Sequence, residues 1–173
     1  NILPALAILY PSTGSTLHAG YMDSIQWTAS DLSGINYSKV LFSTNFGESY
    51  SLVDSVIGND TGIYTLNSWP VPNVISEGCV IKVEVVDNND LINSTQTLGN
   101  FSINDITAPT VSVINPSLGS IYHEHDTLEI SWSALDNIGI DSLVISFNRG
   151  EDDSWITINT NPANSGNYDW AIP

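Results

Sequence analysis

The sequence has very few basic residues: its 173 residues include 3 Lys and Arg against 19 Asp and Glu, which gives a formal net charge of −16 at pH 7. Proteins that bind nucleic acid or anionic membranes need basic surface patches, because phosphate groups attract Lys and Arg. The composition therefore argues against both partners, and no apolar run reaches the length of a membrane-spanning helix. A chain this acidic favours a soluble surface, or one that attracts cations.

Cysteine is almost absent, because Cys79 is the only one, and an internal disulfide is therefore excluded. Cys79 begins the apolar segment CVIKVEVV, where we expect a buried side chain rather than a reactive thiol. The apolar start NILPALAILYP lacks the basic residues of a secretion signal. It also aligns with a later apolar segment that starts at Ala108, so we expect a strand there.

The usual signatures of catalysis are also missing. The sequence contains no G-x-S-x-G, no H-E-x-x-H, no Gly-rich phosphate loop and no cluster of Cys and His. His18 and His123 occupy one repeated turn position, which indicates a structural role. The sequence therefore predicts a protein that is not an enzyme.

The sequence does contain an internal repeat. The stretch HAGYMDSIQWTASD at His18–Asp31 returns as HEHDTLEISWSALD at His123–Asp136, and the match resumes at Trp69–Pro72 against Trp170–Pro173. A period of about a hundred residues fits a small domain rather than a solenoid unit. The ungapped matches are Pro11 with Pro116, Gly14 with Gly119, Ser15 with Ser120, His18 with His123, Ile25 with Ile130, Trp27 with Trp132, Ala29 with Ala134, Asp31 with Asp136, Gly34 with Gly139 and Ile35 with Ile140.

The hydrophobic pattern predicts an all-β protein. In SIQWTAS, Ile25, Trp27 and Ala29 alternate with polar residues, which is typical of a half-buried strand, and Trp132 lies in the same pattern in LEISWSA. We expect both tryptophans to face a sandwich core, and no stretch shows helical periodicity. Seven short strands are predicted in the first copy, at about residues 5–9, 24–30, 40–44, 50–53, 62–66, 80–86 and 98–103.

The second copy carries the frame D-x-T-A-P-x-V-x-V-x-x-P-x-x-G-S, followed by W-x-A-x-D-N-x-G-I. This frame resembles the Ig-like and fibronectin-like repeats of prokaryotic cell-surface and secreted proteins. The resemblance implies two tandem Ig-like β-sandwich domains, at residues 1–104 and 105–173, and an extracellular or cell-surface location. The matching residues are Asp105, Thr107–Pro109, Val111, Val113, Pro116, Gly119, Ser120, Trp132, Ala134, Asp136, Asn137, Gly139 and Ile140.

The two copies differ in length. The first continues past Trp69–Pro72 for two more predicted strands, whereas the second reaches Pro173 at the equivalent point. We therefore expect the second sandwich to be incomplete and to lack its last two strands in this chain. Because an open apolar core is unfavourable, the missing strands are expected from a longer chain or, alternatively, from a partner that donates them.

Acidic loop residues suggest calcium sites, since calcium binds six to eight oxygen atoms of carboxylates, amides and carbonyls. Asp31 ends the second strand of the first domain, and the last long loop should bring Asp87 and Asp90 to the same end. A second site is predicted at the domain junction. Its ligands would be Asp105, Asp136, the carbonyl of Ile138 and Asp141. The alternative is that all of these are solvated turn residues.

The sequence thus favours a structural or adhesive segment, a spacer or stalk, of a secreted or cell-surface protein. Its expected partners are neighbouring domains of a longer chain, with a glycan or another surface protein as further candidates. One alternative is a carbohydrate-binding module, which would need exposed aromatic side chains. Another is an accessory region of a secreted hydrolase whose catalytic domain lies outside this chain. The aromatic residues nominated for glycan binding are Trp155 above all, with Tyr37, Phe46 and Tyr50.

Overall fold

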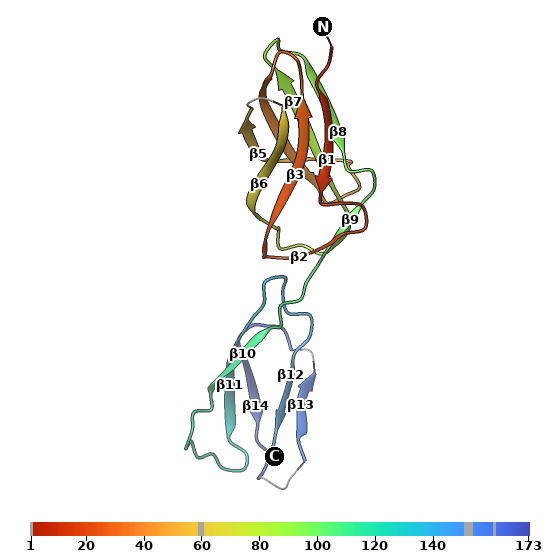
Figure 1. Cartoon of the computed structure of the whole chain (residues 1–173). Helices are drawn as coiled ribbons and strands as arrows, with labels where there is room; N and C mark the ends of the chain where they lie inside the picture. The colour runs from red at the N-terminus through yellow and green to blue at the C-terminus, as the bar shows by residue number, and fades with distance from the viewer. Residues whose placement is uncertain (1, 59–60, 151–153, 161) are drawn as a thin grey trace. The chain divides into compact units, whose positions relative to one another are not determined.

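The structure, a computed structural model, describes all residues except 1, 59–60, 151–153 and 161, and every regular element within the described residues is a β-strand (Figure 1). The chain divides into two compact units, Asn1–Ile106 and Thr107–Pro173. The boundary predicted from the sequence lay between residues 104 and 105. Among the described residues, no helix has the length and hydropathy needed to cross a membrane.

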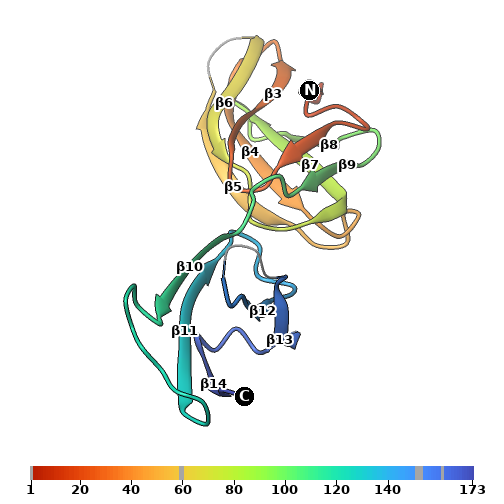
Figure 2. The ribbon, with the colours of Figure 1, turned by 90° about the horizontal axis from the view of Figure 1, so that it is seen from below.

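The first unit is a sandwich of two sheets whose strands curve around a common interior (Figure 2). One sheet has the order β1-β3-β6, and the other has the order β2-β9-β7-β4-β5, with β8 paired to β7. Its strands are β1 (Ala5–Tyr10), β2 (Thr16–His18), β3 (Met22–Ser30), β4 (Ile35–Ser43), β5 (Ser51–Ile57), β6 (Gly62–Pro70), β7 (Ser76–Asp87), β8 (Ile92–Gln96) and β9 (Phe101–Asn104).

Alternation of apolar and polar residues builds the core of the first unit. On β3, Ile25 and Trp27 are fully buried, as the period of two predicted. On β7, Ile81 and Val83 face them from the other sheet and are also fully buried. The strand pattern therefore fixes which faces of the two sheets meet, and it places the C-terminal end of β7, at Asp87, in the loop described below.

The second unit repeats this plan with five strands among its described residues. They form a sheet of order β10-β11-β14 and a separate pair, β12-β13. The strands are β10 (Thr110–Asn115), β11 (Thr127–Leu135), β12 (Val144–Phe147), β13 (Ile156–Thr160) and β14 (Asn167–Ala171). Trp132 on β11 is buried, at the place that Trp27 occupies in the first unit.

The repeat extends to the irregularities of the strands. The β1–β3 ladder shifts register between Ile8 and Tyr10, and the β10–β11 ladder shifts between Val113 and Asn115. The two strand pairs β4–β5 and β12–β13 also share a shift, which follows Val40 in one and Ile145 in the other. Five strands of the second unit thus have counterparts in the first, so that a residue on one of these strands identifies its counterpart in the other unit.

The sequence did not predict two strands of the first unit, β2 and β8. The strand β2 has only three residues, of which Leu17 alone is buried, and this is too short for a period-two signal. The strand β8 reads INSTQ, a polar sequence whose turn-forming residues favour a loop. It forms because it pairs antiparallel with β7, so the neighbour rather than the local sequence decides its conformation.

The shortfall of the second unit is larger than the two strands expected. Its described residues contain no counterpart of β7, β8 or β9, and the stretch equivalent to β2 is not a strand. One of the additional differences is the unforeseen β8. The other is the stretch equivalent to β2. In the first unit β2 pairs with β9, and among the described residues of the second unit this stretch has no such neighbouring strand.

Candidate functional site

The first unit brings two of its three predicted acidic ligands together. Asp31 follows the end of β3 and Asp87 ends β7, and both carboxylates accept a hydrogen bond from the hydroxyl of Ser33. The donor–acceptor distances are 2.7 Å to Asp31 Oδ1 and 3.1 Å to Asp87 Oδ2. We call this group the carboxylate pair.

Asp87 is the structural centre of the pair, because its side chain is buried and its oxygens bind the backbone of its own loop. Its Oδ1 accepts hydrogen bonds from the backbone N–H of Asn89 at 2.8 Å and of Leu91 at 2.7 Å. Asn88 joins the two loops by donating its side-chain N–H to the carbonyl of Ser33 at 2.7 Å. Much of the acceptor capacity of Asp87 is thus used to hold a turn.

A glycine allows the two loops to approach each other. Gly34 has a φ of +83°, and a Cβ atom at this position would lie 2.8 Å from the side-chain nitrogen of Asn88. A larger residue would therefore be strained in its backbone and crowded at once. Gly139, its counterpart in the repeat, also has a positive φ, but an added Cβ there would have no heavy atom within 4 Å.

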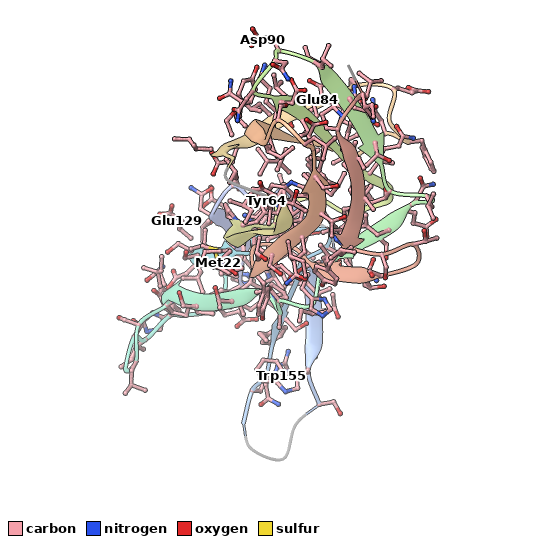
Figure 3. The ribbon with its side chains drawn as sticks, turned by 45° about the horizontal axis from the view of Figure 1, so that its top comes forward. Met22, Tyr64, Glu84, Asp90, Glu129 and Trp155 are labelled. Atoms are coloured by element: carbon pink, nitrogen blue, oxygen red, sulfur yellow. The ribbon has the colours of Figure 1, made fainter. Side chains whose placement is uncertain are left out.

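Asp90 does not join the carboxylate pair. Its side chain is exposed, and its position in Figure 3 is at the outer tip of the loop. Its φ of +63° lies in the left-handed region, which Asp and Asn tolerate better than most residues. In the described part of the chain, no group of three or more His, Cys, Asp or Glu side chains is arranged to hold a metal ion.

The other predicted calcium ligands lie in loops of either unit. In the second unit, Asp136 Oδ1 accepts hydrogen bonds from the backbone N–H of Ile138 at 2.8 Å and of Gly139 at 3.0 Å, which is the turn role of Asp31 repeated. Asp141 is exposed, and Asp105 belongs to the first unit. The sequence did not anticipate that Ser33 would link Asp31 and Asp87, although serine two residues after Asp is a signal for this kind of turn.

Calcium binding by these residues stays a prediction, and thermal unfolding tests it. A bound cation that prefers the folded chain raises the melting temperature. The sequence-based hypothesis expects an increase with millimolar calcium that chelator reverses and that Asp31→Asn diminishes. Equal melting temperatures with calcium and with chelator would leave the hydrogen-bonded turns as the whole role of these carboxylates.

The hydrogen bonds of Ser33 also predict a pH effect. The hydroxyl and the backbone N–H of Ser33 both donate to Asp31, and they hold the pKa of its carboxyl below the ordinary value. A depressed pKa in the folded state contributes stability above the unfolded-state value of about 4. This contribution is lost as the pH falls through the folded-state pKa.

We therefore expect the melting temperature of the parent chain to exceed that of Asp31→Asn at neutral pH, and the difference to shrink below about pH 4. Melting curves of both chains across that range measure the effect. A difference that does not change with pH would show that the Ser33 hydrogen bonds do not depend on the charge of Asp31.

The second unit has an apolar groove between its two sheets. We define the apolar groove by the residues that line it, among them Val111, Val113, Trp132, Phe147, Trp155 and Trp170. Trp155, the residue nominated for glycan binding, lies just before β13 and is 73% exposed at the groove (Figure 3). The rings of Phe147 and Trp170 lie 4.7 Å apart inside it.

The other nominated aromatic residues are scattered over the first unit. Tyr50 donates a hydrogen bond from its hydroxyl to Gln96 at 2.9 Å, and Lys39 lies over the ring of Tyr37. Phe46 is 66% exposed. Only Trp155 is therefore combined with a groove that contains further aromatic rings.

The sandwiched sheets of the first unit, the register shifts that both units share and a buried tryptophan in each unit define an all-β fold of the Ig-like sandwich class. Residues 109–173 match the model of a family described as the bacterial Ig domain. The expected resemblance to bacterial Ig-like repeats is thereby confirmed. Domains of this kind are generally non-catalytic and typically extracellular or associated with the cell surface.

Among solved structures, the fibronectin(III)-like modules of Clostridium thermocellum CbhA share 19% sequence identity with the chain, covering 98% of it and 80% of their own length. The TM-score is 0.36, which is too low a likeness to bear on fold or function. No curated protein matches the chain.

Proposed function

We propose that the chain is a non-catalytic, tension-bearing spacer in an extracellular or cell-surface protein, connected to neighbouring domains. The observation that carries this proposal is the pairing of β2 with β9. The strand β9 is the last of the first unit and β2 is its second, after β1; the two run parallel, with Thr16 opposite Ser102 and His18 opposite Asn104. Further backbone bonds extend the contact, among them Ser102 N–H to the carbonyl of Ser15 at 2.9 Å.

The parallel pair of β2 and β9 contributes to how the unit responds to tension. Pulling at the two ends of the unit loads β1 and its ladder with β3 first, and then β2 and β9, which must slide past each other, so that their hydrogen bonds are stretched together. In an antiparallel hairpin that is pulled from its open end, the bonds break one after another. The first arrangement resists force better, because no single bond can yield alone, and such resistance suits a spacer.

Single-molecule pulling on the full chain tests this proposal. Attachment near the ends of the first unit, at residues 3 and 106, is expected to give an unfolding force several times that seen with attachment at Asn36 and Ile57. The latter positions lie at the open end of the β4–β5 ladder, which would unzip. The control changes only the direction of pulling. Equal forces in the two geometries would contradict the proposal.

Ser102→Pro provides a matched variant, since it removes the N–H that bonds to Ser15. We expect it to lower the unfolding force for end-to-end pulling while the Asn36–Ile57 force stays unchanged. Equal losses in the two geometries would indicate general destabilisation instead.

Carbohydrate binding is the second candidate function, and the exposed Trp155 beside other aromatic rings supports it. A module with this function would bind polysaccharide and would lose binding on Trp155→Ala. Glycan-array binding of the full chain and of this variant decides between the two functions. Tyr50→Ala, on the first unit, is the matched aromatic control. An accessory role beside a hydrolase predicts the same spacer behaviour with a catalytic domain as neighbour.

A further inference from the structure

The first unit has an opening in its side, between the strands β1 and β8, which we call the side opening. These strands belong to different sheets and lie side by side (Figure 1). At one end of the opening, Asn93 donates its side-chain N–H to the carbonyl of Pro4 at 2.9 Å. At the other end, Gly14 donates its backbone N–H to the carbonyl of Asn100, also at 2.9 Å. The cavity between these contacts has a volume of about 460 Å³.

Both walls of the side opening are edge strands. Among the described strands, β1 pairs only with β3, and β8 pairs only with β7. Alternate residues of an edge strand direct their backbone N–H and C=O groups away from the sheet, where another chain can pair with them. The strand β1 reads ALAILY, without the charged residues or proline that commonly protect an edge. Its residues Leu6–Leu9 line the opening and therefore offer backbone groups to a ligand.

A buried hydroxyl without a partner also lines the side opening. The backbone N–H of Thr97 donates to the carbonyl of Ile81 at 2.9 Å, which continues the β7–β8 pairing by one residue and turns the side chain inward. Thr97 is 7% exposed, and its Oγ1 has no hydrogen-bond partner among the described residues. Such a hydroxyl has lost its bonds to water without replacement, so a polar ligand atom that reaches it is favoured.

The lining of the side opening carries no charge, although the formal net charge of the chain is −16. None of the described residues that line it is acidic, basic or a histidine. Leu9 and Leu98 lie at its rim and are 45% and 103% exposed. A charged ligand would lose hydration here without meeting an opposite charge. The lining therefore favours an uncharged ligand with both apolar and polar groups.

We propose that the side opening binds an extended, uncharged peptide segment of a partner protein, which adds as a strand to the free edge of β1. The peptide backbone pairs with Leu6–Leu9, a polar group of the peptide reaches Thr97, and apolar side chains pack on the rim. The walls favour this occupant because a peptide backbone presents donors and acceptors at the spacing of an edge strand. The site lies within the first unit and does not depend on the response to force.

Peptides of defined sequence test strand addition to the full chain. The parent probe is a blocked hexapeptide of alternating valine and threonine. Two further probes carry N-methyl groups either on the valine nitrogens or on the threonine nitrogens, so each has one blocked edge. Amide chemical shifts of the chain measure binding. We expect changes at Leu6–Leu9 and Thr95–Leu98 with the parent and with only one N-methyl isomer, because alternate N–H groups of a strand face one edge.

Two variants of the chain make the result specific. Thr97→Val keeps the shape of the side chain and removes the hydroxyl, so the melting temperature should stay equal or rise while peptide affinity falls roughly fivefold. Leu98→Asp places a charge at the exposed rim, and it should abolish binding without changing the melting temperature. The matched control is Ser94→Ala, on the opposite face of β8, which should keep both properties.

The outcomes decide the matter in either direction. Binding of one N-methyl isomer alone, together with its loss in Leu98→Asp, supports the proposal. If no probe at millimolar concentration changes the shifts around the side opening, the opening holds only water and the proposal is wrong. Equal binding of the two isomers contradicts strand addition. Binding that is unchanged in both Thr97→Val and Leu98→Asp would place the peptide elsewhere on the chain and would also overturn the proposal.

Discussion

Trp27→Ala is expected to destabilise the first unit by about 3–5 kcal/mol, the range for truncating a large buried aromatic side chain. The ring of Trp27 is fully buried and stacks on Tyr64 at a centroid distance of 5.6 Å. Its indole N–H donates a hydrogen bond of 3.2 Å to the hydroxyl of Ser38, which is also buried. Truncation therefore leaves a cavity and removes the partner of a buried hydroxyl at the same time.

Because small domains are stable by only about 5–15 kcal/mol, this loss should bring the first unit close to unfolding at ambient temperature. Denaturant unfolding followed by hydrogen exchange on β3 measures it separately from the second unit. Trp155→Ala is the matched control, and its 73% exposed ring predicts a change within about 0.5 kcal/mol. A loss below about 1 kcal/mol for Trp27→Ala would contradict the described core.

The same truncation at Trp132 should cost less. This ring is buried, and its N–H donates a 3.1 Å hydrogen bond to the side chain of Asn164, but it also lines the apolar groove. Side chains around an open groove can relax into the space that truncation creates, which reduces the cavity cost.

Asp87→Ala is expected to destabilise the first unit by about 2–3 kcal/mol, since bonds to a charged acceptor contribute more than neutral ones. The variant leaves the N–H groups of Asn89 and Leu91 without the carboxylate and removes one acceptor of Ser33. Asp87→Asn keeps one carbonyl acceptor and should lose less. Urea unfolding at neutral pH, with chelator present, gives these differences without any contribution from calcium.

The matched control for Asp87 is Asp90→Asn, three residues along the same turn. Asp90 is exposed and its positive φ suits Asn as well as Asp, so the change should stay within about 0.5 kcal/mol. Equal effects at the two positions would mean that net charge, rather than the buried hydrogen bonds, controls stability here.

The core could be predicted because it depends on a periodic signal that the sequence carries locally. The alternation around Ile25 and Trp27 places both residues inside, and the repeat transfers this placement to Trp132. The strands β2 and β8 could not be predicted, because a neighbouring strand rather than their own sequence stabilises them.

The candidate site could likewise be predicted only in part from the sequence. The direction of the strands alone predicts that Asp31 and Asp87 lie at one end of the sandwich. In the structure both carboxylates accept a hydrogen bond from the hydroxyl of Ser33. Asp90 is exposed in the turn, with a φ of +63°, and no pattern in the sequence indicates this local conformation. The calcium hypothesis named all three residues, and the composition of the loop does not indicate which of them lie together.

The uneven burial of the tryptophans makes Trp155 distinguishable by its fluorescence from the buried indoles. Trp27 and Trp69 of the first unit are 0% and 3% exposed, whereas Trp155 of the second is 73% exposed. A neutral quencher such as acrylamide should extinguish the red-shifted emission of Trp155 first and leave the blue-shifted emission of the enclosed indoles. The quencher-resistant fluorescence then comes from the buried Trp27, Trp69 and Trp132, whereas the quenched component reports on the surroundings of Trp155, so that region of the second unit can be followed in the intact chain without an added label.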